Sequence, residues 1–171
     1  MMRVAMARHA FRARRAAFLK HLLACAILSW PPLALALPPA MDFAADARLM
    51  REHKVPMLLL FSAAGCDWCD RARQQVLDPM ATDPATASRV LLRQIDIDRR
   101  VPITDFSGKA TTHGDFARSR KVRLTPTLMV LDPEGREIAE AIVGVRLADF
   151  YGTYIERAID AGIFYMRRTT P

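Results

Sequence analysis

Two cysteines, Cys66 and Cys69, are separated by two residues near the middle of the chain, a spacing suited to redox chemistry. An apolar run over 55–61 precedes them, and a segment with helical spacing, 66–80, begins with them. The first sulfur would lie beside the free N–H groups of the first helical turn, which stabilise a thiolate. Because only a thiolate attacks a disulfide, we expect Cys66 to be the nucleophile and Cys69 the resolving thiol.

Half of a zinc site is the alternative interpretation of this spacing. A structural zinc ion needs four ligands. The third cysteine, Cys25, lies in a segment that we expect to be removed, and His53 and His113 do not follow each other at zinc-finger spacing. The pattern therefore favours a redox pair without a metal.

Residues 1–36 have the features of an export signal. They contain six Lys or Arg residues and no Asp or Glu, and an apolar stretch, 22–37, follows the basic part. Ala34-Leu35-Ala36 is a small-x-small cleavage site. The apolar stretch holds two prolines and is shorter than the roughly 20 residues of a spanning helix, so a retained anchor is less favoured. We expect a periplasmic protein that is not inserted in the membrane after cleavage.

The charge of the remaining chain excludes an obvious nucleic-acid partner. The whole chain has 25 basic and 18 acidic residues, a formal net charge of +7. Six of the 25 lie in 1–36, which leaves 19 basic against 18 acidic residues. A nearly neutral domain gives no support to a basic binding face.

Cleavage would also leave Cys66 and Cys69 as the only cysteines, and a disulfide between them closes too short a loop to stabilise the fold much.

The hydrophobic pattern predicts alternating helices and strands. In chain order these are a helix over 42–53 capped by Asp42, a strand over 55–61, a helix over 66–80 ended or kinked by Pro79, a polar connector over 82–88, a strand over 90–98, a loop-like insertion over 99–114, a helix over 115–121 with Asp115 as N-cap, strands over 126–132 and 137–143, and a helix over 147–161 stopped by Gly162.

This order predicts an α/β fold with a central mixed sheet of about four strands flanked by helices. The continuously apolar strand over 55–61 is typical of a strand that is buried on both faces. The expected organisation is a signal peptide over 1–36, a linker over 37–41, one domain over 42–163 and a C-terminal tail over 164–171.

Three stretches resemble the thioredoxin superfamily, over roughly 42–161. They are the Phe61–Cys69 segment with the cysteine pair, the Val122–Leu128 segment with Thr125-Pro126-Thr127, and Glu134-Gly135 followed by Ile142-Val143-Gly144. The resemblance implies a thioredoxin-like fold and a redox-active disulfide between Cys66 and Cys69. It also implies a cis bond before Pro126 that places the Thr125 backbone beside Cys66, where a substrate peptide pairs in strand fashion.

In detail the chain is most similar to exported bacterial thioredoxin-like proteins. These include proteins associated with sulfur-oxidation gene sets and the C-terminal domain of the transmembrane thiol reductase. The implied partners are protein thiols or disulfides and a redox partner protein, for which a membrane thiol reductase would be a natural donor. No cofactor is implied, because the electrons travel through the cysteines.

The sequence departs from cytosolic thioredoxins around the cysteine pair. Leu60 occupies the position of their buried acid, and Asp67 and Trp68 lie between the cysteines. Carboxylates at Asp67 and Asp70 oppose a thiolate at Cys66, which favours the reductase direction, although both are also good first-turn helix residues. Trp68 is either an exposed contact for substrate or half-buried against the loop of Pro126.

Other features leave further interpretations open. His113 is interpreted as a solvated loop histidine. A basic cluster, Arg118, Arg120, Lys121 and Arg123, is interpreted as a solvated face. Two further functional hypotheses are a binding or chaperone-like module that keeps the fold, and a carrier of sulfur compounds on Cys66.

Overall fold

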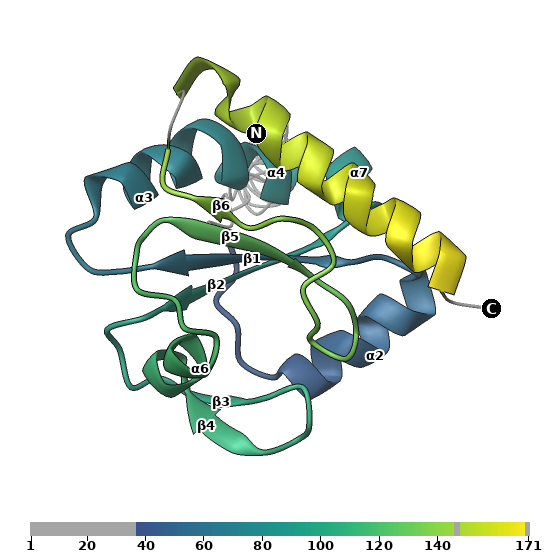
Figure 1. Cartoon of the computed structure of the whole chain (residues 1–171), viewed down its shortest axis with the longest axis horizontal. Helices are drawn as coiled ribbons and strands as arrows, with labels where there is room; N and C mark the ends of the chain where they lie inside the picture. The colour runs from purple at the N-terminus through teal and green to yellow at the C-terminus, as the bar shows by residue number, and fades with distance from the viewer. Residues whose placement is uncertain (1–36, 146–147, 170–171) are drawn as a thin grey trace, which may run out of the picture. The chain divides into compact units, whose positions relative to one another are not determined.

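The computed structural model describes residues 37–145 and 148–169, and they build a four-stranded sheet in the order β2-β1-β5-β6 (Figure 1). The central strand β1 (Met57–Ser62) pairs in parallel with β2 (Leu91–Asp96) and antiparallel with β5 (Thr127–Leu131). A short strand β6 (Ile142–Val143) pairs antiparallel with β5. The predicted α/β fold with a mixed four-stranded sheet is confirmed.

All six residues of β1 are buried, which explains its unbroken apolar sequence. Successive side chains point to opposite faces of the sheet. Met57, Leu59 and Phe61 therefore join one hydrophobic cluster, and Leu58 and Leu60 join the other.

Helices cover both faces of the sheet (Figure 1). The first face, which includes Phe61, is covered by α2 and α6, and the second, which includes Leu60, by the helices that follow Cys66 and by the C-terminal helix α7. The helix bounds are α2 Phe43–His53, α3 Asp67–Ala72, a π-helical turn Arg73–Leu77, α4 Asp78–Thr82, α5 Pro84–Ala87, α6 His113–Ser119, a 3₁₀ turn Ala148–Phe150, and α7 Tyr151–Thr169.

The helix after the cysteines does not end at Pro79. It continues to Thr82 through the π-helical turn, in which the N–H of Asp78 bonds the carbonyl of Arg73. Proline has no N–H to donate and its ring crowds the preceding turn. The wider π turn directly before Pro79 accommodates the proline within a continuous helix.

The predicted loop over 99–114 is wrong in part, because it contains a second, two-stranded sheet. β3 (Pro102–Thr104) pairs antiparallel with β4 (Ala110–Thr112). Helix α6 then begins at His113, and Thr112 rather than Asp115 is its N-cap, since the Thr112 hydroxyl accepts from the Asp115 N–H. The Thr112 hydroxyl also donates to the Asp115 carboxylate at 2.6 Å, so the two side chains fix each other at the start of the helix.

The segment 37–41, predicted as a linker, is packed against the sheet. The backbones of Pro38 and Ala40 bond the N–H and carbonyl of Gln94 in β2. Leu37 and Ala40 are buried. The free edge of β2 needs hydrogen-bond partners, and this segment supplies two of them.

Two predictions near the C-terminus are wrong. Only Ile142–Val143 of the predicted strand 137–143 form β6, and Glu137 makes a single bridge to Leu131. Helix α7 does not stop at Gly162 but runs to Thr169, so most of the predicted tail 164–171 belongs to it. A Cβ at Gly162 would lie 2.5 Å from Cγ1 of Val130, so this glycine serves the close approach of α7 to β5.

Within 37–145 and 148–169, no helix is both long enough and apolar enough to cross a membrane.

The two glycines of α7 predict opposite effects of the same substitution. Gly162→Ala should lower the free energy of unfolding by about 1–3 kcal/mol, because the new methyl group overlaps Val130. Gly152→Ala is the matched control, since its Cβ would lie 3.9 Å from Val76. It should raise the free energy of unfolding by up to about 1 kcal/mol through the lower backbone entropy of alanine. Urea denaturation of both variants checks this, and equal stabilisation by both would contradict the packing argument.

Candidate active site

The cysteine pair lies where β1 ends and α3 begins. Cys66 is the N-cap of α3, and its sulfur accepts a hydrogen bond from the Cys69 N–H at 3.2 Å. The two cysteines form a disulfide with a Cα–Cα distance of 5.2 Å. Cys66 is partly exposed, whereas Cys69 is fully buried. An incoming thiol or disulfide can therefore reach Cys66 while Cys69 stays behind it.

The loop before β5 reaches the same site. The Thr125–Pro126 bond is cis, as predicted. The Thr125 hydroxyl donates to the Cys66 sulfur at 3.4 Å, and Pro126 is buried, with its carbonyl accepting from the Gly144 N–H at 2.8 Å. This proximity follows from the strand register, because Thr127 pairs with Phe61 at the end of β1 that leads to the cysteines.

Trp68, between the cysteines, is exposed. The guanidinium of Arg71 lies 4.8 Å from the centre of its ring. Leu124, next to Thr125 in the sequence, is also exposed, with 65% of its surface accessible. With 49% of its surface accessible, Trp68 is half-buried and still presents an exposed face, which agrees with both interpretations.

The two aspartates beside the cysteines have different surroundings. Asp67 is exposed in the first turn of α3. Asp70 forms an ion pair with Arg73. The negative charge of Asp70 is therefore balanced one turn along the helix, and the effect of carboxylates on a Cys66 thiolate rests mainly on Asp67.

Arg73 also links the helix to the sheet and was missed in the sequence. Its guanidinium donates to Gln94 Oε1 at 3.1 Å and to Ser62 Oγ at 3.5 Å. Leu60, at the position of the buried acid in thioredoxins, lies on the same face of β1 and is fully buried. Ser62, two residues after Leu60 on that face, is the β1 residue that Arg73 contacts, so a cation four residues after Cys69 lies near the position of the missing acid. The four-residue spacing of Cys69 and Arg73, which places both on one side of a helix, was the sequence feature that could have identified Arg73.

Asp98 was also missed. Its carboxylate accepts a hydrogen bond from the Ala64 N–H at 3.1 Å, in the loop before Cys66. Asp98 follows β2, and the carboxyl ends of two parallel neighbours share one edge of a sheet. The predicted order of the strands, together with this rule, could have identified it.

The interpretation of His113 as a solvated loop residue is wrong. It is 2% exposed and is the first residue of α6. Its Nδ1 accepts from the Asp96 N–H at 3.1 Å, and its Nε2 lies 3.0 Å from the Ala40 carbonyl. Both ring nitrogens are engaged with backbone groups, so His113 connects α6, β2 and the 37–41 segment rather than serving the cysteines.

Among the described residues, no group of three or more His, Cys, Asp or Glu side chains is arranged to hold a metal ion.

A cysteine pair at a helix start, facing a cis-proline loop on a mixed sheet, defines a thioredoxin-like protein. The family model described as a thioredoxin-like domain matches residues 43–158. The chain therefore belongs to the thioredoxin-like family.

Solved structures with the same fold include one described as the DsbH oxidoreductase, at 17% identity and a TM-score of 0.53, covering 78% of this chain and 92% of that one. A thioredoxin from Nicotiana alata has 18% identity, a TM-score of 0.48, and coverage of 72% and 96%. Oxidised mitochondrial thioredoxin 3 from Saccharomyces cerevisiae has 18% identity, a TM-score of 0.49, and coverage of 72% and 93%. No curated protein sequence gives a match. At 17% identity, the DsbH oxidoreductase structure shows the fold alone.

Tyr151, the first residue of α7, lies near the site with a buried hydroxyl that has no hydrogen-bond partner among the described residues. It borders a small cavity of about 90 Å³ together with Trp68, Ala72 and Val76. Burial raises the pKa of the Tyr151 hydroxyl to about 12. The ring contributes to the core while the hydroxyl destabilises the fold.

Tyr151→Phe should therefore raise the free energy of unfolding by about 1 kcal/mol at neutral pH. The gap should widen between pH 10 and about 12, because the unfolded tyrosine ionises near 10 while the folded one does so only at the higher pKa. Denaturant titrations of the variant and the wild type over this range check both effects. Tyr154→Phe, at a 38% exposed position of the same helix, is the control and should change little. A destabilised Tyr151→Phe protein would mean that the hydroxyl has a partner.

Proposed function

We propose that the protein is an exported thiol–disulfide oxidoreductase that exchanges disulfides with protein thiols through Cys66 and Cys69. The observation that carries this proposal is the partly exposed Cys66 sulfur, bonded to the Cys69 N–H and contacted by the Thr125 hydroxyl. These two donors, together with the free N–H groups of the first helical turn, stabilise a thiolate on Cys66 in the reduced protein.

In the reductase direction, the Cys66 thiolate attacks one sulfur of a substrate disulfide. A mixed disulfide forms, and the other substrate sulfur leaves as a thiolate that takes up a proton. Cys69 then loses its proton and attacks the Cys66 sulfur. The Cys66–Cys69 disulfide forms, the second substrate thiol is released, and two electrons have passed to the substrate.

The surroundings of Cys66 suit an extended segment of a substrate protein. Thr125 lies two residues before β5, and its hydroxyl contacts the Cys66 sulfur, so a substrate peptide could pair in strand fashion with the Thr125 backbone beside the reacting sulfur. The exposed side chains of Trp68 and Leu124 lie next to the reacting residues in the sequence and offer apolar contact. Trp68, Thr125 and Pro126 are accordingly proposed to bind substrate.

The reductase direction is the favoured one. Asp67 lies beside Cys66 in the first turn of α3, and a nearby carboxylate disfavours the Cys66 thiolate. A less stable thiolate makes the reduced form a better electron donor. The oxidised protein then needs a partner that reduces it again, and a membrane thiol reductase would supply these electrons in the periplasm.

The surroundings of Leu37 support removal of residues 1–36. The backbone nitrogen of Leu37 donates to Oδ1 of Asp78 at 2.9 Å, and the Leu37 side chain is buried. Cleavage after Ala36 would turn this nitrogen into an ammonium group that faces a carboxylate, which strengthens the hydrogen bond. The mature N-terminus would thus be held on α4.

Trapping of the mixed disulfide tests the proposed function. Cys69→Ser, expressed from the full chain in native cells, should accumulate as covalent adducts with partner proteins, because the resolving thiolate is missing. Non-reducing gels and mass spectrometry would identify the partners, and the same spectra should show a mature chain that begins at Leu37. Cys66→Ser is the matched control and should form no adduct.

If Cys69→Ser forms no adducts in its native compartment, the enzyme proposal fails. A Cys66→Ser strain that keeps the full phenotype would instead support the binding-module hypothesis.

The direction of electron flow is tested separately, by the redox state of the wild-type protein in growing cells. A reductase that is supplied with electrons should be mostly reduced, because its donor returns it to the dithiol after each turnover. Acid quenching followed by thiol alkylation measures the two forms. A mostly oxidised protein that still forms adducts as Cys69→Ser would reverse the direction and leave the exchange chemistry in place.

A further inference from the structure

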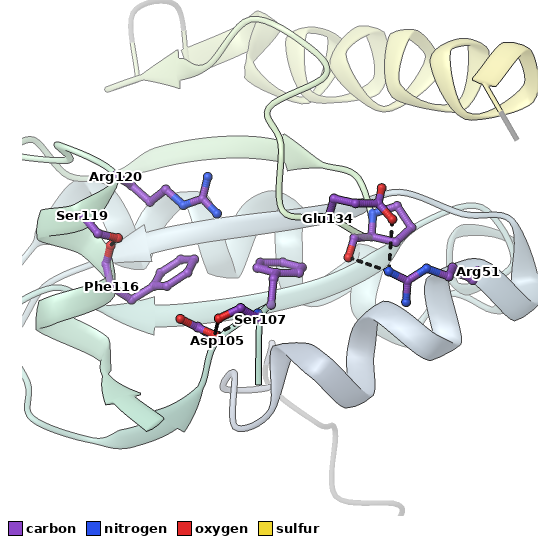
Figure 2. Close-up of a pocket in the computed structure, with 9 residues that line it drawn as sticks. Arg51, Asp105, Ser107, Phe116, Ser119, Arg120 and Glu134 are labelled. Atoms are coloured by element: carbon purple, nitrogen blue, oxygen red, sulfur yellow. Dashed lines mark hydrogen bonds and ion pairs between the residues drawn. The ribbon is translucent and has the colours of Figure 1, made fainter. Parts of the chain in front are cut away.

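A second pocket lies away from the cysteines, on the face of the sheet covered by α2 and α6 (Figure 2). Its volume is about 480 Å³, within the range of small-molecule sites. Pro133 and Glu134 line this pocket, and they follow Leu131, which pairs with Met57 at the first residue of β1. The cysteines follow the last residue of β1, so the pocket and the cysteines lie at opposite ends of this strand. We call it the Arg120 pocket after the side chain that points toward its centre.

The guanidinium of Arg120 is half-buried in this pocket and has no hydrogen bond or ion pair within the described ranges. It lies 5.0 Å from the centre of the Phe116 ring. The backbone of Gly135 lies close by, and a Cβ there would be 2.8 Å from an Arg120 nitrogen. The sequence had grouped Arg120 with a solvated basic face, and the structure corrects that interpretation.

Burial lowers the pKa of Arg120, while the negative charges of Glu137, Asp105 and Asp132 raise it. None of these three acids lies within ion-pair distance of Arg120. A buried charge is costly unless it is paired. Arg120 therefore has donors available that a bound anion would satisfy.

The other charged groups that line the pocket already have partners. Arg51 donates to Glu134 at 3.0 Å and to the Pro133 carbonyl at 3.3 Å. Asp105 accepts from the Ser107 hydroxyl at 2.6 Å and from two backbone N–H groups. Of the two lining guanidiniums, Arg120 is thus the one that contacts an aromatic ring but has no hydrogen-bond acceptor or ion-pair partner among the described residues.

The wall beside Arg120 is aromatic. Phe106 and Phe116 both line the pocket, and each packs on Phe43 with ring centres 4.7 Å apart. Phe43 is fully buried in the core, so its packing holds the rings of Phe106 and Phe116 in place. Phe116 is 5% exposed and has the Arg120 guanidinium over its ring, so the partly exposed Phe106 is the ring that an apolar group can contact while its charged end reaches Arg120.

We propose that the Arg120 pocket binds a small organic monocarboxylate with an aromatic or other apolar body. The carboxylate accepts charge-assisted hydrogen bonds from Arg120, and the body packs on Phe106. The two arginines and two acids of the lining cancel in formal charge, and only Arg120 among these four has no hydrogen-bond or ion-pair partner in the described residues, so one carboxylate is what the pocket can pair. A dianion such as phosphate would lack an apolar group for the wall and would be repelled by Asp105 and Glu134. The site is independent of the cysteine chemistry.

Nuclear magnetic resonance titration of the purified protein tests the proposal, with 3-phenylpropionate as the probe and 3-phenylpropanol as its neutral analogue. The probe should produce saturable shifts of the Ser107, Phe116 and Ser119 signals. The alcohol should bind at least about tenfold more weakly, because it lacks the charge that pairs with Arg120. Inorganic phosphate should not displace the probe.

Arg120→Gln should weaken probe binding at least about tenfold while the melting curve shows a folded protein. Arg118→Gln is the matched control, since Arg118 lies on the same helix, is 68% exposed, and should leave binding unchanged. Equal binding of acid and alcohol by the wild type overturns the proposal without any variant. So does an Arg120→Gln protein that binds the probe normally, displacement by phosphate, or a lack of saturable shifts at millimolar probe.

Discussion

The complete burial of β1 between two strands and two helical layers is the constraint on which the site depends. Its register aligns Phe61 with Ile95 on one side and with Thr127 on the other. That alignment brings three segments to one edge of the sheet. They are the loop that leads to Cys66, the segment after β2 that contains Asp98, and the cis-proline loop before β5. The Thr125 hydroxyl can reach the Cys66 sulfur because β1 ends at the same level of the sheet at which its antiparallel neighbour β5 begins.

The charged residues beneath the cysteine pair differ from those of the thioredoxin pattern, because an apolar residue takes the position of the acid and a cation lies nearby. With Leu60 in place of an acid, the layer under α3 has no carboxylate at that position to accept the proton of the resolving thiol. The cation Arg73 instead bridges Asp70 on the helix to Gln94 and Ser62 on the sheet. It fixes the end of α3 to the strands through hydrogen bonds, so the helix that begins at the cysteines is positioned by a charged link as well as by packing.

The features predictable from the sequence are those governed by local pattern. The apolar run of β1 predicted a strand buried on both faces, and Asp42 predicted a helix cap. The cis bond before Pro126 was expected only from the family resemblance. Gly162 was misread because its role depends on Val130, which lies in another element. The same reason applies to Arg73 and His113, whose partners lie 21 and 17 residues away, at Gln94 and Asp96. Periodicity contains no information about such partners until the strands are placed.

Helix α6 joins the two regions that the sheet keeps apart. Its C-cap is Arg120, and the chain then turns at Lys121, whose φ of 59° is left-handed, before it reaches Thr125 five residues after Arg120. Backbone bonds from Lys121 and Val122 back to α6 hold this turn. The start of the cis-proline loop is therefore held by the end of α6, in addition to the strand register that aligns Thr127 with Phe61.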